Sequence, residues 1–326
     1  MVNVGAPVDS WARWLELSKR FVLQFQNHCN PSALQSSYYN SVEHGSHFHA
    51  MLESDSKRTA AHALAGSAGH SFDCCGLGGT RVNAKIGAGR RSKRMLRSGT
   101  NAGVYHTVYL PTEWTADKQC PITVELTGNG PYRNQFGDEC SGRPEDACLG
   151  YGLCAGKQFI CICLPFLNAA GDDIALTWWG ARPAYDPTAT LNYIQSALDD
   201  ACREFNANPK QVVLTGFSRG AIACNYLGLY DDKIALRWKA FIAFSHYDGV
   251  CEWPCPNSDA EAARVRLKRL GNRPQFICGE MDQAVVTERY LKPLMTLRKS
   301  PSPRQALARL IHVIHFLSWV IVQHRL

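Results

Sequence analysis

The sequence lacks any uninterrupted apolar stretch of the ~20 residues that a membrane-spanning helix needs. Its longest apolar stretch lies near the C-terminus, between Leu310 and Val322, and is interrupted by His312 and His315. We therefore expect no membrane span. The segment 301–326 is instead predicted to be an atypical apolar tail, with a final helix or strand docked on a sheet.

Secretion signals are also missing from the sequence. The first residues do not combine a basic segment with an apolar core, as a signal peptide does. The tripeptide Asn30-Pro31-Ser32 is blocked as a glycosylation acceptor by its proline. Yet the chain has 14 cysteines, which suits a secreted or extracellular protein better than a cytosolic enzyme. The sequence therefore leaves the localisation open.

The cysteines beyond the N-terminal region fall into two sets. Cysteines in polar, turn-like surroundings would suit disulfides, whereas those in apolar strand or helix patterns are predicted to be buried thiols. The first set comprises Cys120, Cys140, Cys148, Cys154, Cys251 and Cys255, and the second comprises Cys161, Cys163, Cys202, Cys224 and Cys278. Structural zinc is a weaker alternative, because no second pair matches Cys161 and Cys163 with finger-like spacing. We predict neither a metal nor a cofactor.

Charged residues are few and unevenly placed. They make up 19% of the chain against 45% hydrophobic residues, which is the balance of a globular protein. The net charge of +7 is concentrated in Lys85–Arg97, a run without an acidic residue. Because this run is rich in Gly, Ala and Ser and lacks interleaved aromatics, we interpret it as a solvated linker. A localisation signal or a polyanion patch is the alternative, and nucleic-acid binding is not predicted.

The composition divides the chain into three parts. Residues 1–98 are predicted to hold one possible helix, over Trp11–Gln26, followed by a mostly disordered basic linker that cannot bury enough apolar surface to offset its ordering entropy. Residues 99–300 are predicted to form one α/β domain. Residues 301–326 form the apolar tail.

Strand and helix patterns alternate through the predicted domain. Strands are expected over 104–111, 121–126, 159–165, 211–214, 240–244 and 275–278. Helices are expected over 188–205, after Ser218, over 260–270 and over 287–297, with a kink or break at Pro293. Alternating strands and helices with short loops predict a mostly parallel central sheet with helices on both faces.

One short motif within this pattern carries chemistry. Gly216-Phe217-Ser218-Arg219-Gly220 follows a strand and precedes an apolar helix. A nucleophile elbow needs a serine on such a sharp strand-to-helix turn, with small residues two before and two after it. The helix N-terminus also offers N–H groups to a developing oxyanion. We predict that Ser218 is the nucleophile and that the Arg219 N–H is one oxyanion donor, with a second from the loop at Gly128 and Asn129.

The acid and the base of a catalytic triad remain alternatives. Asp282 follows the strand 275–278, and Asp248 follows the preceding strand; strand order favours Asp282. For the base, His312 and His315 lie in the apolar tail, where in a helix they would share a face. His246 departs from the usual chain order but lies at a strand end.

The segment from about Tyr105 to Leu291 resembles serine esterases of the α/β-hydrolase superfamily, including dienelactone-hydrolase-like and acetyl-xylan or polyester-depolymerase-like groups. The resemblance rests on residues 216–221, the loop 126–130, and Gly279-Glu280-Met281-Asp282. It implies an α/β-hydrolase fold and cleavage of a small or polymeric ester through a covalent acyl-enzyme, without a cofactor.

Two other functions stay open at this point. The tail departs from the polar histidine-bearing loop of these families, which would suit a catalytically impaired binding protein that keeps the fold. A peptidase of the same superfamily is the other alternative. Trp178, Trp179 and Tyr185, which lie before the helix 188–205, either line an apolar or sugar-binding pocket or belong to the core.

Overall fold

The computed structural model describes residues 82, 85–98, 103–133, 139–279, 282–296 and 311–315, all of which lie in the compact unit Gly79–Leu326. The helix expected over Trp11–Gln26 lies outside the described residues. Within the described part of the chain, no helix combines the length and the apolar composition needed to cross a membrane.

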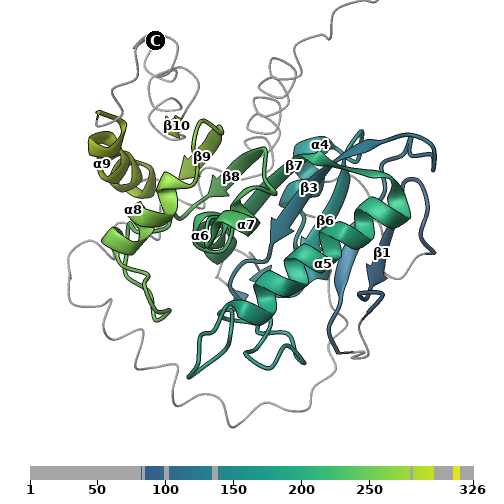
Figure 1. The fold of residues 1–326 in the computed structure, drawn as a ribbon, viewed down its shortest axis with the longest axis horizontal. Coiled ribbons are helices and arrows are strands. Elements are labelled where there is room, and N and C mark those ends of the chain that lie inside the picture. Colours follow the sequence, from purple (N-terminus) through teal and green to yellow (C-terminus); the bar gives the residue numbers. More distant parts are fainter. Residues whose placement is uncertain are drawn as a thin grey trace, which may run out of the picture. The chain divides into compact units, whose positions relative to one another are not determined.

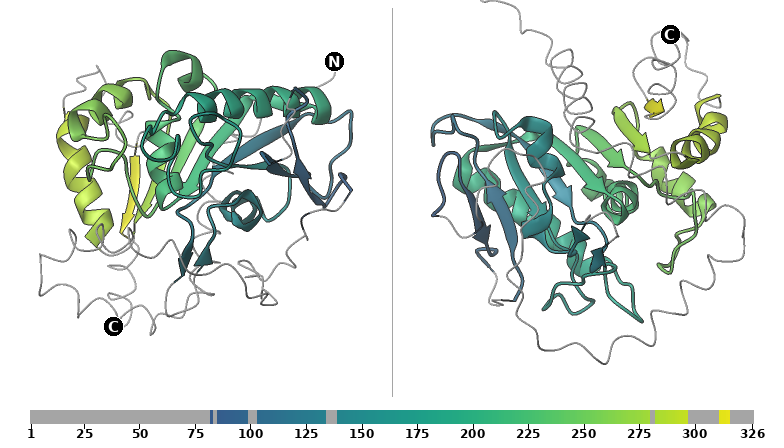
Figure 2. Two further views of the ribbon diagram at one scale, coloured as in Figure 1. Left: turned by 90° about the horizontal axis from the view of Figure 1, so that it is seen from below. Right: turned by 180° about the vertical axis from the view of Figure 1, so that it is seen from behind.

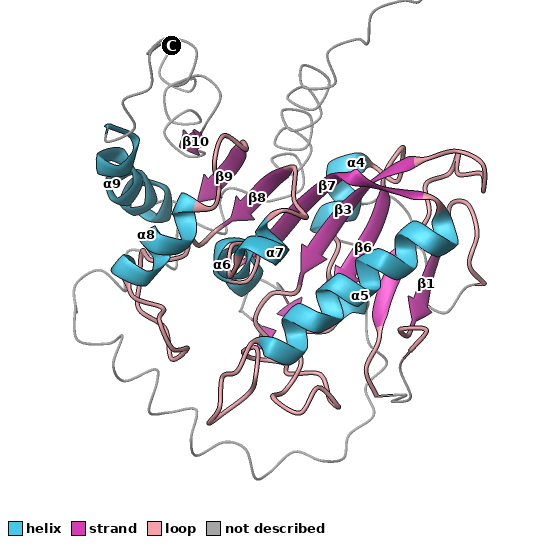
Figure 3. Ribbon diagram, in the orientation of Figure 1, coloured by secondary structure: helices cyan, strands magenta, loops and turns pink. Residues whose placement is uncertain are grey.

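A sheet of eight strands forms the centre of the unit (Figures 1 and 3). Its strands are β1 (Arg91–Arg94), β2 (His106–Tyr109), β3 (Cys120–Leu126), β6 (Ile160–Leu164), β7 (Ala207–Phe217), β8 (Ala240–Phe244), β9 (Gln275–Gly279) and β10 (Ile311–His315). The helices are α4 (Leu149–Cys154), α5 (Thr188–Phe205), α6 (Arg219–Tyr226), α7 (Asp232–Ala235), α8 (Ala260–Lys268) and α9 (Asp282–Thr296). The connection from β3 to α4 holds a ribbon of β4 (Tyr132–Arg133) and β5 (Glu139–Cys140) and the 3-10 helix η2 (Pro144–Asp146).

Most strands of the sheet end at one common edge. The order is β1-β2-β6-β3-β7-β8-β9-β10. β2 is antiparallel to both neighbours, and every pair from β6 to β10 is parallel. Because the carboxyl ends of parallel strands meet at the same edge, β3, β6, β7, β8, β9 and β10 all end there. We call it the carboxyl edge.

Both faces of the sheet are covered by helices. Leu214 and Thr215 are consecutive residues of β7, so their side chains point to opposite faces. Leu214 lies against Gly228, just after α6, whereas Thr215 lies against Gly150 of α4. Leu198 of α5 shares the main hydrophobic core with Leu214, which puts α5 on the face opposite α4 (Figure 2). This mostly parallel sheet with helices on both faces confirms the predicted α/β-hydrolase class of fold.

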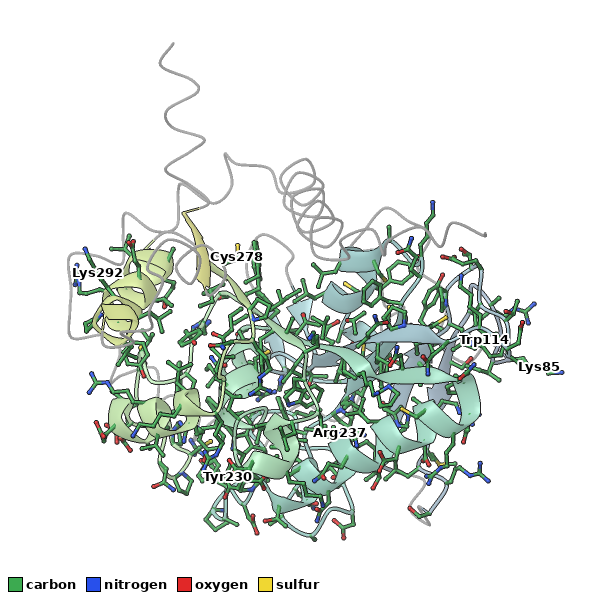
Figure 4. The ribbon with its side chains drawn as sticks, turned by 45° about the horizontal axis from the view of Figure 1, so that its top comes forward. Lys85, Trp114, Tyr230, Arg237, Cys278 and Lys292 are labelled. Atoms are coloured by element: carbon green, nitrogen blue, oxygen red, sulfur yellow. The ribbon has the colours of Figure 1, made fainter. Side chains whose placement is uncertain are left out.

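The longest helix, α5, has the bounds predicted from its periodicity, and both ends have a physical cause. At its start, the Asp186 carboxylate accepts hydrogen bonds from the Thr188 N–H and hydroxyl at 2.9 and 2.7 Å. At its end, Asn206 adopts a left-handed conformation with φ 53°, which terminates helices. Trp114, labelled in Figure 4, donates from Nε1 to the Phe205 carbonyl at 3.1 Å and so satisfies one terminal carbonyl.

The bounds of β8 are as predicted, whereas those of α9 differ. α9 begins at Asp282 rather than at residue 287. Pro293 lies inside α9, which continues past it, so Pro293 does not break the helix. The helix is held by packing as well as by backbone bonds, since the buried Leu291 contacts a cluster that includes Ala243 and Ile277. Tertiary packing of this kind tolerates one lost backbone bond.

The basic run Lys85–Arg97 was interpreted as a solvated linker, and the structure shows otherwise for part of it. Part of it forms β1, which pairs with β2 at the edge of the sheet, so a solvated linker is wrong for that part. Arg91 donates to the Pro144 carbonyl at 2.6 Å, and Arg94 pairs with Glu204 at 2.5 Å. Composition suggested solvation because these acceptors lie far away in the sequence.

No disulfide joins any two of the described cysteines, from Cys120 to Cys278. Cys120, Cys154 and Cys255, which were assigned to turn-like surroundings, are buried, while Cys202, predicted to be buried, is half-buried. No group of three or more His, Cys, Asp or Glu residues in the described ranges is placed to hold a metal ion.

A buried histidine predicts how stability depends on pH. Burial lowers the pKa of His106 to about 4, and its Nδ1 lies 2.9 Å from the Tyr193 hydroxyl. In the unfolded chain, His106 takes up a proton at its ordinary pKa of 6.5. The neutral, buried His106 therefore contributes fully to the unfolding free energy above pH 6.5, and this contribution is lost as the pH falls toward 4. We expect the wild type to lose about 3 kcal/mol more unfolding free energy over this range than His106→Gln.

Urea unfolding of both chains at pH 7.5 and at pH 4.5 measures this difference. An equal loss in the two chains would show that His106 is not the group responsible.

Candidate active site

The turn between β7 and α6 forces Ser218 into a rare backbone conformation. Ser218 has φ 55° and ψ −119°, a region that costs a non-glycine residue free energy. Gly216 and Gly220 make the turn possible. A Cβ at Gly216 would lie 2.3 Å from the Gly220 carbonyl carbon, and one at Gly220 would lie 2.2 Å from the Leu126 carbonyl oxygen. The strained serine is thus held against β3, and its N–H donates to the Phe244 carbonyl of β8 at 3.0 Å.

The loop after β3 lies beside this turn. Leu126 pairs with Gly216 in the sheet, so Gly128 and Asn129 leave β3 at the carboxyl edge next to Ser218. A Cβ at Gly128 would lie 3.4 Å from the Phe217 carbonyl oxygen. The structure therefore brings together the predicted nucleophile and the predicted donors of the oxyanion hole.

The Arg219 side chain joins the turn to that loop, which the sequence analysis missed because it used only the Arg219 N–H. Its guanidinium donates to Asn129 Oδ1 at 3.0 Å and to the Gly128 carbonyl. It also donates to the Leu176 carbonyl at 2.8 Å, which accepts from the Gly130 N–H at 2.9 Å as well. Arg219 therefore ties the loop 127–130 to the segment that carries Leu176.

The surroundings of Arg219 are apolar. Its guanidinium carbon lies 4.9 Å from the centre of the Phe166 ring and 5.7 Å from that of Trp178. Burial lowers the pKa of Arg219 to about 9. The charge is stabilised by carbonyl and amide oxygens and by ring faces, which is a costly arrangement for a residue without a positional role.

Asp248, one of the two candidate acids, is fully engaged elsewhere. Both carboxylate oxygens accept from Arg266 of α8 at 2.9 Å, and the two side chains are buried. Arg266 also lies over the Tyr226 ring at 4.4 Å. The pair fixes α8 to the loop after β8, a role that sequence spacing could not reveal.

His246, one of the three candidate bases, follows β8 directly. Its Nδ1 lies 2.9 Å from the Ser245 hydroxyl, and its ring meets that of Trp253 edge-on at 5.8 Å. Burial lowers the pKa of His246. Because Ser218 binds the Phe244 carbonyl, His246 comes two residues after a direct partner of the serine.

The remaining candidates lie further along the same edge. Asp282 begins α9, just beyond the end of β9 at Gly279. His315 pairs with Gly279 as the last residue of β10, whereas His312 pairs with Phe276 in the strand interior. This backbone is a strand, so the shared helical face considered for the two histidines does not exist. The register places His315, rather than His312, at the carboxyl edge.

Of the two tryptophans before α5, one belongs to the hydrophobic core and the other is partly exposed. Trp179 is fully buried and packs on Phe166 and Tyr226 at 5.4 and 4.7 Å, so it belongs to the core. Trp178 is half-buried and lies 5.4 Å from Trp253, ring centre to ring centre. Trp178 and Trp253 thus connect Arg219 and His246, and Trp253 carried no signal in the sequence.

Tyr185, the third aromatic residue considered, bonds within its own loop. Its hydroxyl accepts from Arg182 Nε at 2.8 Å. Its backbone has φ 49°, and its N–H donates to the Ala181 carbonyl at 2.8 Å. These contacts shape the loop before α5.

Comparison with known proteins gives likenesses of fold. No family model and no curated protein matches this chain. Esterase 2 of Thermogutta terrifontis, solved after phosphorylation by paraoxon, is similar over 62% of this chain and 78% of its own, with 14% identity and a TM-score of 0.39. MGS-M1, an α/β hydrolase enzyme from a Medee basin deep-sea metagenome library, is similar over 62% of this chain and 77% of its own, with 15% identity and a TM-score of 0.38.

Other solved structures are longer than the matched region. A thermostable esterase is similar over 61% of this chain at 14% identity and a TM-score of 0.37, and the chain spans about half of it, 51%. The acylaminoacyl peptidase of Pyrococcus horikoshii is similar over 64% of this chain at 15% identity and a TM-score of 0.38, and only 36% of that chain is covered.

Proposed function

We propose that this protein is a serine hydrolase that cleaves a carboxylic ester through an acyl-enzyme on Ser218. The observation that carries the proposal is the backbone of Ser218, at φ 55° between two glycines that no larger residue could replace. A strained serine between a central strand and a helix is the arrangement of a nucleophile elbow, which exposes the hydroxyl beyond the sheet. Strain of this kind is kept where function needs it.

The oxyanion hole in this proposal has two sides. The Arg219 N–H is at the start of α6, where backbone donors have no intrahelical acceptor and the helix dipole favours negative charge. The loop at Gly128 and Asn129 supplies the second side. In the transition state these donors would stabilise the charge that develops on the carbonyl oxygen.

We assign the acid to Asp282 and the base to His315. Both follow Ser218 in the chain order expected of the fold; His315 is the last residue of β10, and Asp282 begins α9, the helix after β9. Asp248 is a poorer acid, since Arg266 occupies both of its oxygens. His246 is the alternative base.

A fluorophosphonate probe tests the nucleophile. We expect the wild type to be labelled and Ser218→Ala to lose labelling, because the probe reacts only with an activated serine. Ser196→Ala, on α5, is the matched control and should be labelled like the wild type. Absence of labelling in a folded wild type would contradict the proposal and favour a hydrolase-fold binding protein.

Hydrolysis of p-nitrophenyl acetate tests the base. We expect His315→Ala to lower kcat about 10²–10⁴-fold, the usual contribution of a general base. His312→Ala, three residues earlier in β10, should retain most of the rate and serves as the control. Loss of activity in His246→Ala alone would assign the base to His246.

If His246 is the base, the acid limb of the pH profile of kcat/KM would lie at a lower pH than for an ordinary histidine. Burial lowers the pKa of His246 below its ordinary 6.5, and a base works only when unprotonated. The acid limb of kcat/KM would then have its midpoint below pH 6.5.

Loss of the Arg219 side chain is expected to change kcat rather than KM. Arg219→Met removes the donors that hold Gly128 and Asn129, so the oxyanion loop is released while the backbone N–H at 219 remains. We expect kcat to fall about 100-fold with little change in KM, as when one oxyanion donor is lost. Arg219→Lys keeps the charge but not the fork of donors and should rescue only part of the rate. An unchanged kcat in a folded Arg219→Met would exclude this role.

A further inference from the structure

Two thiols face each other on the α4 side of the sheet, away from the serine. Cys154 is the last residue of α4, and Cys161 is the second residue of β6. Their sulfur atoms lie 3.2 Å apart, and both residues are buried. They share a small cluster with Tyr109 and half-buried Tyr151 and Phe159.

The chain between these cysteines is fixed, so their approach is built into the fold. Ala155 and Gly156 both have positive φ, at 51° and 68°, which turns the chain sharply from α4 toward β6. The Tyr109 hydroxyl donates to the Gly156 carbonyl at 3.1 Å. A Cβ at Gly156 would lie 2.7 Å from that hydroxyl, so only glycine allows the contact.

The two sulfurs are not equivalent. Hydrogen bonds from the Cys161 thiol and from the backbone N–H groups of Gly156 and Lys157 lower the pKa of Cys154. Burial, with the bond to Cys154, raises the pKa of Cys161. The lower pKa favours Cys154 as the sulfur that attacks first, with Cys161 as its hydrogen-bond donor.

We propose that Cys154 and Cys161 form an oxidisable dithiol that closes to a disulfide on reaction with a small hydroperoxide. The Cys154 thiolate sulfur attacks the peroxide oxygen, the O–O bond breaks, and hydroxide leaves, giving a sulfenic acid. The Cys161 sulfur then attacks the Cys154 sulfur, the S–O bond breaks, and water leaves. The two thiols lose two electrons, and one hydrogen peroxide becomes two waters.

Closure needs little movement. The sulfurs move from 3.2 Å to the ~2.0 Å of a disulfide bond. The neighbouring Cys163 is held differently, since Arg91 donates to its sulfur at 3.4 Å and its thiol donates to the Ala147 carbonyl at 3.3 Å. The burial of both sulfurs favours hydrogen peroxide over bulky disulfide reagents such as oxidised glutathione.

The disulfide would fix the end of α4 to β6. α4 already contacts β3 through the Gly150 N–H, which donates to the buried Glu125 carboxylate at 2.8 Å. We expect the cross-link to raise Tm by about 5 °C. This proposal is independent of the function of Ser218, and labelling of the serine should be the same before and after oxidation.

Peptide mapping of the full chain tests the pair. The reduced protein is treated with hydrogen peroxide, its remaining thiols are blocked with iodoacetamide, and the chain is digested with trypsin. Cleavage after Lys157 separates the two cysteines. We expect a cross-linked peptide pair that dithiothreitol resolves, and a slower reaction with oxidised glutathione.

Variants assign the sulfurs without reference to activity. Cys154→Ser and Cys161→Ser should each abolish the cross-link. Trypsin does not cleave before Pro144 or Pro183, so the same two peptides also hold Cys140, Cys148, Cys163 and Cys202. Serine variants of these four cysteines should each retain the cross-link. Alkylation of both cysteines after peroxide, over-oxidation of Cys154 without a cross-link, or a cross-link that persists in Cys154→Ser would each overturn the proposal; the mapping of the wild type decides even where a variant does not fold.

Discussion

The close approach of α6 to β3 is the constraint on which the site depends. With Gly220 in contact with the Leu126 carbonyl, and Gly216 in contact with Gly220, the chain has room for one residue in an unfavourable conformation. That residue is Ser218. The strands on both sides of β7 are parallel to it, so β3, β8, β9 and β10 all end at the same edge. The turn 216–220 is contiguous in the sequence, but its conformation also depends on the contact of Gly220 with β3.

The buried guanidinium of Arg219 extends this constraint to the loops. A buried charge needs hydrogen-bond partners, and carbonyl and amide oxygens from two separate segments accept from both terminal nitrogens of this guanidinium, while its buried Nε has no partner among the described residues. The loop 127–130 and the segment before α5 are thereby joined to the residue that follows Ser218. The same segment carries Trp178, whose contact with Trp253 leads to His246.

Much of the fold could be predicted from the sequence because its signals are local. The ends of α5 carry their own capping residues, and β8 is a continuous apolar run of the kind that a covered parallel strand requires. The strand-to-helix context of Ser218 was readable for the same reason. The motif, the strand before it and the helix after it are contiguous in the chain.

Other features depend on partners that composition cannot show. β1 was assigned to a linker because the acceptors of Arg91 lie far along the chain. Strand order favoured Asp282 over Asp248, but the sequence could not show that Arg266 binds both oxygens of Asp248. The apolar tail was compatible with a helix or a strand, and pairing with β9 makes its described residues, Ile311–His315, a strand.

The central claim is that Ser218 forms a covalent acyl-enzyme, and rapid acid quenching of the protein with p-nitrophenyl acetate tests it most directly. Trypsin releases residues 211–219 as one peptide in which Ser218 is the only serine. Mass spectrometry of that peptide should find one acetyl group, located on Ser218, that disappears as turnover proceeds. An unmodified peptide from a chain that hydrolyses the ester, or an acetyl group on another residue, would contradict the claim.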